Sequence, residues 1–386
     1  MIKESQIKKN LKGFSFPRLT GTKFELNAFN KVKQEVESLG LEYEVQNFTF
    51  STFYSRLYPK IAFSLGTLIF FLLYLYRYMI ISWIFIFISM GIIIVSFILT
   101  RKPEKIRFIP KLTSQNLLVK IKSKSNEASN TNRIAMFISH LDSKAQKFKI
   151  QIRIRIIKVW IWSAIILGII TVIKIIVLLR FEIIFYIIGL NPLIPNIIAS
   201  IMIILNTTDN SSDGAVDNAS GIVCNLELLN YYTLPENRLA NYNMWFLFTG
   251  AEECGTMGAR YFLNNLKGLD VDISMIFNFE SITETVFLFP GGREKKHALD
   301  INNLLLNNKR DLTIRHHPTN RILGTHSDGG FLGDHGFQGY GIGGVEAHSY
   351  MHTEHDTVDK VNTDVLTKLC WVLTDSLKEH DSKFFN

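Results

Sequence analysis

Four long apolar runs, arranged as two adjacent pairs, interrupt a chain that otherwise alternates short apolar and polar stretches. The first pair covers residues 61–75 and 79–99, and the second covers 156 to about 179 and 183–205. Each run approaches the roughly 20 residues that a helix needs to cross about 30 Å of hydrocarbon. Buried core helices of a large soluble protein would give a similar pattern, but two adjacent pairs with almost no charge favour two transmembrane hairpins.

Outside these runs, amphipathic segments alternate with shorter apolar ones. Apolar residues recur at helical spacing in residues 22–40, 219–232 and 363–380, which predicts helices. Shorter apolar stretches predict strands at 41–50, 116–123, 133–140, 243–250, 273–280 and 339–347. This alternation indicates a doubly wound α/β sheet, and such sheets bind ligands beyond the carboxyl ends of their strands.

The two predicted hairpins divide the α/β portion into three segments. Because each hairpin returns the chain to the side of the membrane from which it started, residues 1–60, 100–155 and 206–386 can meet as one domain. Their combined length suits a complete α/β enzyme. We therefore predict one domain that is interrupted by transmembrane hairpins at 61–99 and 156–205.

Basic residues are concentrated beside the apolar runs. Lys and Arg number 42 against 34 Asp and Glu, which gives a net charge of +8. Only Arg77, Lys174 and Arg180 lie at the hairpin tips. Twelve basic residues border the other ends of the hairpins: Arg56, Lys60, Arg101, Lys102, Lys105, Arg107, Lys111, Lys147, Lys149, Arg153, Arg155 and Lys158. By the positive-inside rule, the soluble domain is expected on the cytoplasmic side. The pattern indicates a lipid bilayer as partner and argues against nucleic acid.

Composition excludes several classes of protein. With 47% hydrophobic residues the chain can bury a core, so global disorder is excluded. Three cysteines in 386 residues exclude a disulfide scaffold and do not suggest a thiolate zinc site. The first residues contain lysines but no apolar core, so we expect no cleavable signal peptide.

Candidate ligands lie where the predicted strands end. The stretch 133–140 ends at His140, and Asp142 follows two residues later, where it can hold the second nitrogen of the imidazole. Asp217 lies in a Gly-rich turn before a predicted helix, where it could equally cap that helix. Taken singly, each is more typical of an ordinary surface or capping residue.

Three further groups follow the same rule. Glu252 and Glu253 come directly after an apolar strand, and Glu280 ends another. Adjacent carboxylates point in different directions, so one can bind a metal while the other moves a proton. The loop 348–355 holds three histidines. Each of these groups alone could be a solvated turn.

Together, these histidines and carboxylates form a nitrogen and oxygen ligand set without thiolates. Such a set suits zinc or another divalent first-row metal. Five ligands are enough for two metals that share a bridging carboxylate. A metal pair can polarise a carbonyl and activate water at neutral pH, which favours hydrolysis of an amide.

The motifs at 140–143, 214–221, 252–258, 278–280 and 352–357 resemble, in the same order, those of the co-catalytic zinc aminopeptidases. That family includes bacterial leucyl aminopeptidases, glutamate carboxypeptidase II and glutaminyl cyclases. The stretch Arg18-Leu-Thr-Gly21 and the strand after it also resemble the start of the family's domain. The resemblance covers nearly all of the soluble segments and neither hairpin. It implies a phosphorylase/hydrolase-like α/β fold, with a mixed, largely parallel sheet flanked by helices.

The resemblance also implies a role for each candidate residue. The resemblance implies that two zinc ions are bound by five ligands: His140, Asp217, Glu253, Glu280 and His352. Asp217 would bridge the metals and Asp142 would orient His140. Glu252 would be the general base and acid, and the Asp217–Asn218 peptide would be cis. One departure is Met351, which stands where the family often has a tyrosine as oxyanion donor. Related multi-pass enzymes of the secretory pathway also hold this domain on the non-cytoplasmic side, against the charge rule.

The sequence thus favours a membrane-embedded dizinc aminopeptidase that acts on peptides near the bilayer. A carboxypeptidase, a dipeptidase or a glutaminyl cyclase of the same fold is the alternative within the enzymes, although a cyclase needs only one zinc. A non-catalytic receptor or adaptor is the alternative from a different class. The sequence leaves the oligomeric state open.

Overall fold

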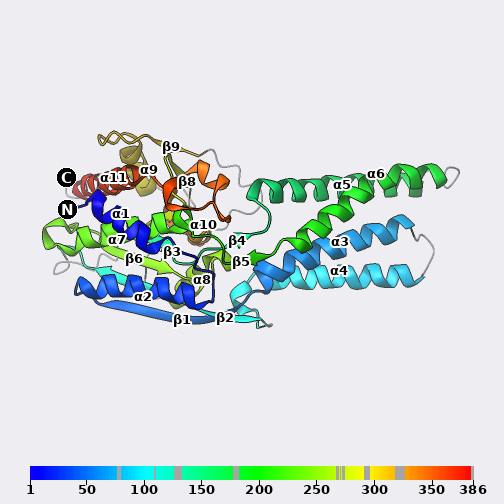
Figure 1. The fold of residues 1–386 in the computed structure, drawn as a ribbon, viewed down its shortest axis with the longest axis horizontal. Coiled ribbons are helices and arrows are strands. Elements are labelled where there is room, and N and C mark those ends of the chain that lie inside the picture. Colours follow the sequence, from blue (N-terminus) through cyan, green and yellow to red (C-terminus); the bar gives the residue numbers. More distant parts are fainter. Residues whose placement is uncertain are drawn as a thin grey trace. The chain divides into compact units, whose positions relative to one another are not determined.

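The chain folds as two units, each assembled from segments that are discontinuous in sequence (Figure 1). The sheet unit comprises residues 1–49, 112–145 and 209–386, and the helical unit comprises 50–111 and 146–208. The computed structural model describes residues 1–75, 80–107, 110–125, 133–176, 182–266, 269, 271, 274–290, 296–317 and 327–383. Arg77 and Arg180, which were predicted at the hairpin tips, lie outside the described residues.

A mixed sheet of eight strands, in the order β1-β2-β6-β3-β7-β10-β8-β9, forms the centre of the sheet unit. The strands are β1 (Tyr43–Ser51), β2 (Lys111–Ile121), β3 (Ile134–His140), β6 (Asn243–Thr249), β7 (Met275–Glu280), β8 (Val286–Pro290), β9 (Ile314–His316) and β10 (Gln338–Gly343). Strands β6, β3, β7 and β10 are mutually parallel, whereas β2 and β8 run antiparallel to their inner neighbours. Two short strands, β4 (Ala145–Gln146) and β5 (Thr208–Asp209), form a separate pair. The predicted mixed, largely parallel sheet is confirmed.

Helices cover both faces of this sheet and create two hydrophobic cores. One core takes side chains from α1 (Glu4–Phe14), α2 (Lys23–Ser38), α7 (Ser220–Thr233), α9 (Lys296–Leu306) and α11 (Thr363–Ser382). The other takes them from α8 (Met257–Asn265) and α10 (Asp328–Asp334). All seven residues of β3 are buried because both faces are covered, which explains its unbroken apolar sequence.

The predicted helix at 22–40 illustrates how local sequence sets the boundaries of an element. The Thr22 side chain accepts a hydrogen bond from the Phe24 N–H and so caps the start of α2. Gly40, with φ +68°, follows the end of the helix in the left-handed region that glycine adopts without strain.

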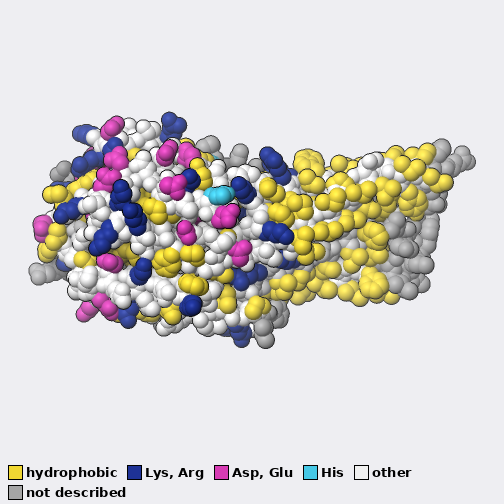
Figure 2. Space-filling view, in the orientation of Figure 1, with side chains coloured by type: hydrophobic (Ala, Val, Ile, Leu, Met, Phe, Trp, Pro, Cys, Tyr) yellow, Lys and Arg dark blue, Asp and Glu magenta, His cyan; other side chains and the backbone are white. Residues whose placement is uncertain are grey.

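The helical unit consists of α3 (Tyr58–Leu75), α4 (Ile80–Thr100), α5 (Ile150–Ile176) and α6 (Glu182–Leu205). All four are long and apolar enough to cross a membrane, with mean hydropathy between 1.6 and 2.6 over the spans. No more than 33% of each span is buried, so most apolar side chains face outward (Figure 2). Helix α5 begins six residues before the predicted run, because Arg153 and Arg155 interrupt the apolar pattern without disfavouring a helix.

A buried polar network joins three of these helices. Thr67 of α3 donates to Asn196 Oδ1 of α6 at 2.7 Å, and Trp160 of α5 donates to Thr67 Oγ1 at 2.9 Å and to Ser200 Oγ at 3.1 Å. In an apolar surrounding, such side-chain hydrogen bonds and small residues hold helices together.

Candidate metal centre

Neighbouring parallel strands end at one edge of the sheet, and each delivers a predicted site residue there. Strand β3 ends with His140, and β7 ends with Glu280. Strand β6 ends at Thr249, which pairs with His140 in the register, and the following turn holds Glu252 and Glu253. The parallel arrangement therefore gathers residues that are far apart in sequence.

Two turns supply the remaining predicted ligands. Asp217 lies in a kink with non-helical backbone angles directly before α7, and the Asp217–Asn218 peptide is cis, as the resemblance implied. His352 lies in the segment after β10 and has φ +62°, a left-handed conformation. The structure thus brings together all five residues that the resemblance implied as ligands.

The first set of potential ligands is His140, Asp217 and Glu280. His140 Nε2 lies 3.2 Å from Asp217 Oδ1 and 3.5 Å from Glu280 Oε2. The other carboxylate oxygen of Glu280 accepts a hydrogen bond of 2.7 Å from the Asn278 side chain. The free oxygen of Glu280 is thereby directed toward His140.

The second set is Asp217, Glu253 and His352. His352 Nε2 lies 3.2 Å from Asp217 Oδ2 and 3.1 Å from Glu253 Oε1. The two oxygens of Asp217 therefore face different histidines, and this carboxylate is common to both sets. This is the arrangement expected of a residue that bridges two metals.

The spacing of these atoms fits zinc. Tetrahedral zinc with bonds of roughly 2.1 Å needs ligand atoms about 3.4 Å apart. The four histidine–carboxylate separations run from 3.1 to 3.5 Å, and all ligand atoms of a set lie within 4.8 Å of one another. Glu253 Oε1 is buried and receives no well-formed hydrogen bond from any described residue. A bound cation would satisfy that oxygen.

The electrostatics of the centre favour cations. Burial alone would lower the pKa of His140, but the surrounding carboxylates of Asp142, Asp217 and Glu280 raise that pKa well above its usual value. Burial alone would raise the pKa of Asp217, yet His140 and His352 hold that pKa well below its usual value. The opposite shifts of His140 and Asp217 both reflect a site in which carboxylates and imidazoles are packed closely together.

Asp142 connects two of the site's segments. His140 Nδ1 lies 3.0 Å from the backbone oxygen of Asp142 and 3.5 Å from its Oδ1, so the backbone carbonyl makes the closer contact. The Asp142 carboxylate accepts hydrogen bonds from the backbone N–H groups of Glu252 and Glu253, each at 3.1 Å, and from Thr20 at 2.6 Å. The carboxylate thus fixes the turn after β6 as well as the end of β3.

Glu252 differs from the other carboxylates of the centre. Its side chain is buried, and within the described part of the chain no group donates a hydrogen bond to its carboxylate. Burial raises the pKa of Glu252 well above its usual value; His140 opposes this shift, whereas Glu280 and Glu253 reinforce it. An unpaired buried carboxyl beside candidate metal ligands is suited to accepting and returning a proton.

Sequence reasoning missed two charged residues of this region. The first is Lys144, whose Nζ lies 2.5 Å from Glu253 Oε2. Burial alone would raise the pKa of Glu253, but the charges of His352 and Lys144 bring that pKa down to about 2. Asp328, at the start of α10, is buried and accepts a hydrogen bond from Thr249. Burial raises the pKa of Asp328 to about 7. The Gly-rich context of Asp328, like that of Asp217, was the available signal.

The other histidines of the loop 348–355 lie outside both sets. His348 Nδ1 contacts the Val345 carbonyl, and His355 is more than half exposed. Tyr350, next to Met351, lies with its ring 5.5 Å from the Lys360 ammonium. The structure therefore places the Tyr350 ring against Lys360.

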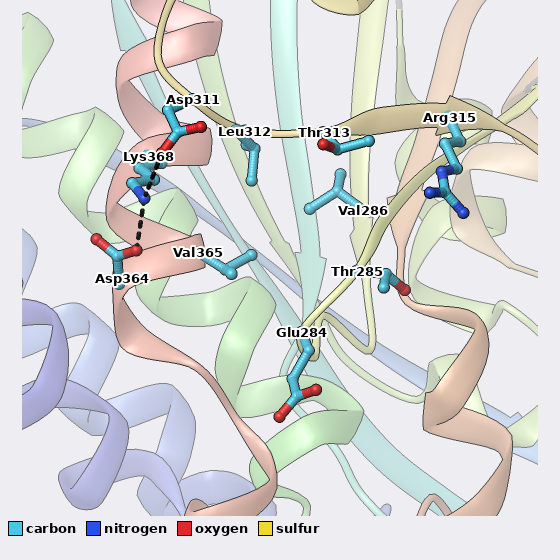
Figure 3. A pocket seen from close by; sticks show the side chains of 10 residues that line it. All are labelled: Glu284, Thr285, Val286, Asp311, Leu312, Thr313, Arg315, Asp364, Val365 and Lys368. Carbon is cyan, nitrogen blue, oxygen red and sulfur yellow. Dashed lines mark ion pairs between the residues drawn. The ribbon is translucent and has the colours of Figure 1, made fainter.

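A separate cavity of about 210 Å³ lies elsewhere in the sheet unit (Figure 3). Lys368 in its wall pairs with Asp364 at 2.8 Å and with Asp311 at 3.8 Å. None of the five candidate ligands lines this cavity. We therefore locate the chemistry at the carboxyl edge of the sheet, where the convergent ligand atoms are.

Residues 200–376 match the sequence profile of peptidase family M28, and no curated protein matches the chain. The fold is similar to an aminopeptidase from Aneurinibacillus sp. strain AM-1, with 14% identity, a TM-score of 0.59, and 98% of this chain and 94% of the other covered. It is also similar to BSAP, a zinc aminopeptidase from Bacillus subtilis, with 12% identity, a TM-score of 0.56, and 98% and 95% coverage. The Fimbriiglobus ruber glutaminyl cyclase gives 10% identity, a TM-score of 0.56, and 98% and 95% coverage.

At these identities the structural similarity establishes the fold, and the profile match identifies the family of the matched segment. The predicted relationship to this peptidase family and the predicted peptidase class are confirmed for the matched segment, on a fold that is shared with zinc aminopeptidases. The matched segment holds Asp217, Glu252, Glu253, Glu280 and His352 but begins after His140 and Asp142.

Proposed function

Since residues 200–376 carry a peptidase family M28 domain on a zinc-aminopeptidase fold, we propose that the chain is a membrane-bound aminopeptidase with two zinc ions. The observation that carries this proposal is the pair of ligand sets that share Asp217, one with His140 and Glu280 and one with Glu253 and His352. A single metal would leave one of these convergent sets of buried ligands unused.

Two zinc ions bound here would polarise the scissile carbonyl and lower the pKa of the attacking water. Glu252 would take the proton from the attacking water and return it to the leaving amine, because none of the residues that the structure describes donates a hydrogen bond to its buried carboxyl. Asp142 holds the backbone of Glu252 and Glu253, so it keeps the base beside the ligands. The proposal keeps the roles that the resemblance implied for the five ligands and for Glu252, and it adds the contact with the turn after β6 to the role of Asp142.

The choice of an aminopeptidase among the peptidases rests on the fold, which is similar to the aminopeptidase from Aneurinibacillus sp. strain AM-1 and to the zinc aminopeptidase BSAP from Bacillus subtilis.

We further propose that the sheet unit is one peptidase domain anchored by α3 to α6, and that it lies on the cytoplasmic side. The four helices are long and apolar enough to span a bilayer. The twelve basic residues that flank them support this orientation by the positive-inside rule. Peptides at or near the membrane surface would then be the accessible substrates.

A panel of reporter peptides tests the proposed activity. Purified protein in detergent with zinc should release the reporter from aminoacyl substrates with a free N-terminus, and should not act on the same substrates after N-acetylation. Release only from C-terminal reporters, or cyclisation of N-terminal glutamine without hydrolysis, would contradict the aminopeptidase assignment. The Glu252→Gln variant serves as the control for contaminating peptidases.

A further inference from the structure

A buried arginine of the N-terminal segment lies among the turns that carry the ligands. Arg18 is fully buried, which is rare for a charged side chain. Its Nε donates to the Leu141 carbonyl at 2.8 Å, and its Nη2 donates to the Gly214 carbonyl at 2.9 Å. Its Nη1 donates to the carbonyls of Phe14, Phe16 and Asp213. Burial lowers the pKa of Arg18 to about 10, so the guanidinium stays charged at neutral pH.

Three of these carbonyls belong to two segments that bear metal ligands. Leu141 lies between His140 and Asp142, whereas Asp213 and Gly214 begin the turn that leads to Asp217. In the sequence these segments are separated by the second hairpin, so no short connection fixes the distance between His140 and Asp217. The planar guanidinium of Arg18 instead links the two segments through its hydrogen bonds to both.

The backbone contacts of Arg18 strengthen this link. The Arg18 N–H donates to Ser143 Oγ, and the Ser143 N–H donates to the Arg18 carbonyl, each at 3.0 Å. A Cβ atom on Gly214, which has φ +61°, would lie 2.7 Å from Arg18 Nη2 and 2.6 Å from Ser143 Cβ. The guanidinium is therefore packed directly against the turn as well as hydrogen-bonded to it.

Asp356 binds the same turn through backbone N–H groups, whereas Arg18 binds it through carbonyl groups. Its carboxylate accepts hydrogen bonds from the N–H groups of Val216 at 2.5 Å and Asp217 at 3.2 Å. Arg18 binds the carbonyls at the start of the turn, and Asp356 binds the amides next to the ligand. The position of Asp217 is thus set by two buried polar side chains, one of which, Arg18, lies outside the family-matched segment.

We propose that Arg18 is a positioning residue for the metal centre: it fixes the end of β3 relative to the Asp217 turn and thereby sets the affinity of the metal shared by His140, Asp217 and Glu280. The inference rests on the proposed function, because it requires a metal at these ligands. Residues that support metal ligands typically change metal affinity by about 10- to 100-fold when they are replaced.

The test compares two substitutions in the full-length, detergent-purified protein. Arg18→Lys keeps the positive charge but cannot donate to carbonyls on several segments at once. The matched control is Asp381→Asn, because the buried Asp381 carboxylate holds the N–H groups of Ala240 at 2.6 Å and Asn241 at 2.9 Å, and is not one of the residues placed at the centre. Zinc affinity is measured by competition with a chromophoric chelator, and Co²⁺ substitution reports the ligand geometry by its visible spectrum.

We expect both variants to unfold at lower temperature than the parent. Only Arg18→Lys should weaken the affinity for one zinc ion by about 10- to 100-fold and change the Co²⁺ spectrum; Asp381→Asn should stay within about twofold of the parent. If Arg18→Lys fails to fold, Ser143→Ala removes the hydroxyl that accepts from the Arg18 N–H and makes a longer contact of 3.4 Å with the Ser212 carbonyl; this variant should weaken the same zinc ion by a smaller factor.

Parental zinc affinity and an unchanged Co²⁺ spectrum in a folded Arg18→Lys or Ser143→Ala protein would overturn the inference while leaving the proposed function intact. A parent protein that binds no zinc would contradict the proposed function, and the inference with it. The two failures are therefore distinguishable by the parent's own titration.

Discussion

Replacing Glu252 by Gln should abolish most of the turnover without removing the metals. The substitution keeps the size of the side chain and removes its ability to accept a proton. No described group donates a hydrogen bond to this carboxylate, so no protein contact is lost on the folded side. The substitution should therefore affect only proton transfer, and general acid–base catalysis typically raises the rate about 10²- to 10⁴-fold. That range corresponds to roughly 2.7 to 5.5 kcal/mol of activation free energy.

The assay measures kcat and KM on an aminoacyl reporter, together with zinc content, for the parent and the variant. We expect kcat to fall about 10²- to 10⁴-fold, with little change in KM and an unchanged zinc content. Glu227→Gln makes the same chemical change at a buried carboxyl that accepts a hydrogen bond from the Lys3 N–H at 3.0 Å, and it should leave kcat near the parental value.

A Glu252→Gln protein whose kcat stays within a few-fold of the parent would refute the assignment. Glu252 would then be only a partner of a neighbouring base. The nearest basic side chain along the chain is Arg260. Its Nε donates to the Gly255 carbonyl at 3.0 Å, and its guanidinium lies over the Phe331 ring.

Three further predictions concern other parts of the molecule. Glu253→Ala removes a ligand and should weaken one zinc ion in a chelator titration, whereas parental affinity would exclude Glu253 from the centre. Burial raises the pKa of Glu25 to about 8, so the folded chain holds a proton that the unfolded chain releases near pH 4.5. The stability that this proton gives the folded state is lost as the pH rises toward 8. Between pH 5 and 9 the melting temperature of the parent should therefore fall relative to that of Glu25→Gln, and a constant difference would contradict this. The topology is tested by labelling intact cells with an impermeant thiol reagent. A cysteine introduced at the exposed Ser382 should be protected and one at Tyr78 should react, and the three buried native cysteines should give little background. The reverse pattern would place the peptidase domain outside the cell.

The elements that carry the site were predictable because their sequences are constrained on both faces. Strand β3 is buried along its whole length, so its apolar run and its polar end at His140 stand out. Strand β8 and the edge strand β9 were missed because they are short, and β9 has only Ile314 buried. Helix α10 was missed because its seven residues are too few to show a helical period.

Contacts made across the fold could not be derived from local pattern. Lys144 follows the His140 motif by one position, yet only the folded chain places its ammonium group against Glu253. Asp142 was expected to orient His140, whereas its carboxylate also binds the Glu252 and Glu253 amides. These contacts join segments more than a hundred residues apart, and nothing in the sequence near either partner specifies them.

The zinc content of the purified, dialysed protein tests the central claim most directly, because the claim is that Asp217 belongs to two ligand sets at once. The parent should hold two zinc ions per chain. Glu280→Gln should weaken one of them, and Asp217→Asn should weaken both. A parental value near one zinc ion per chain that does not fall when His140 is changed to Ala would contradict the two-metal account.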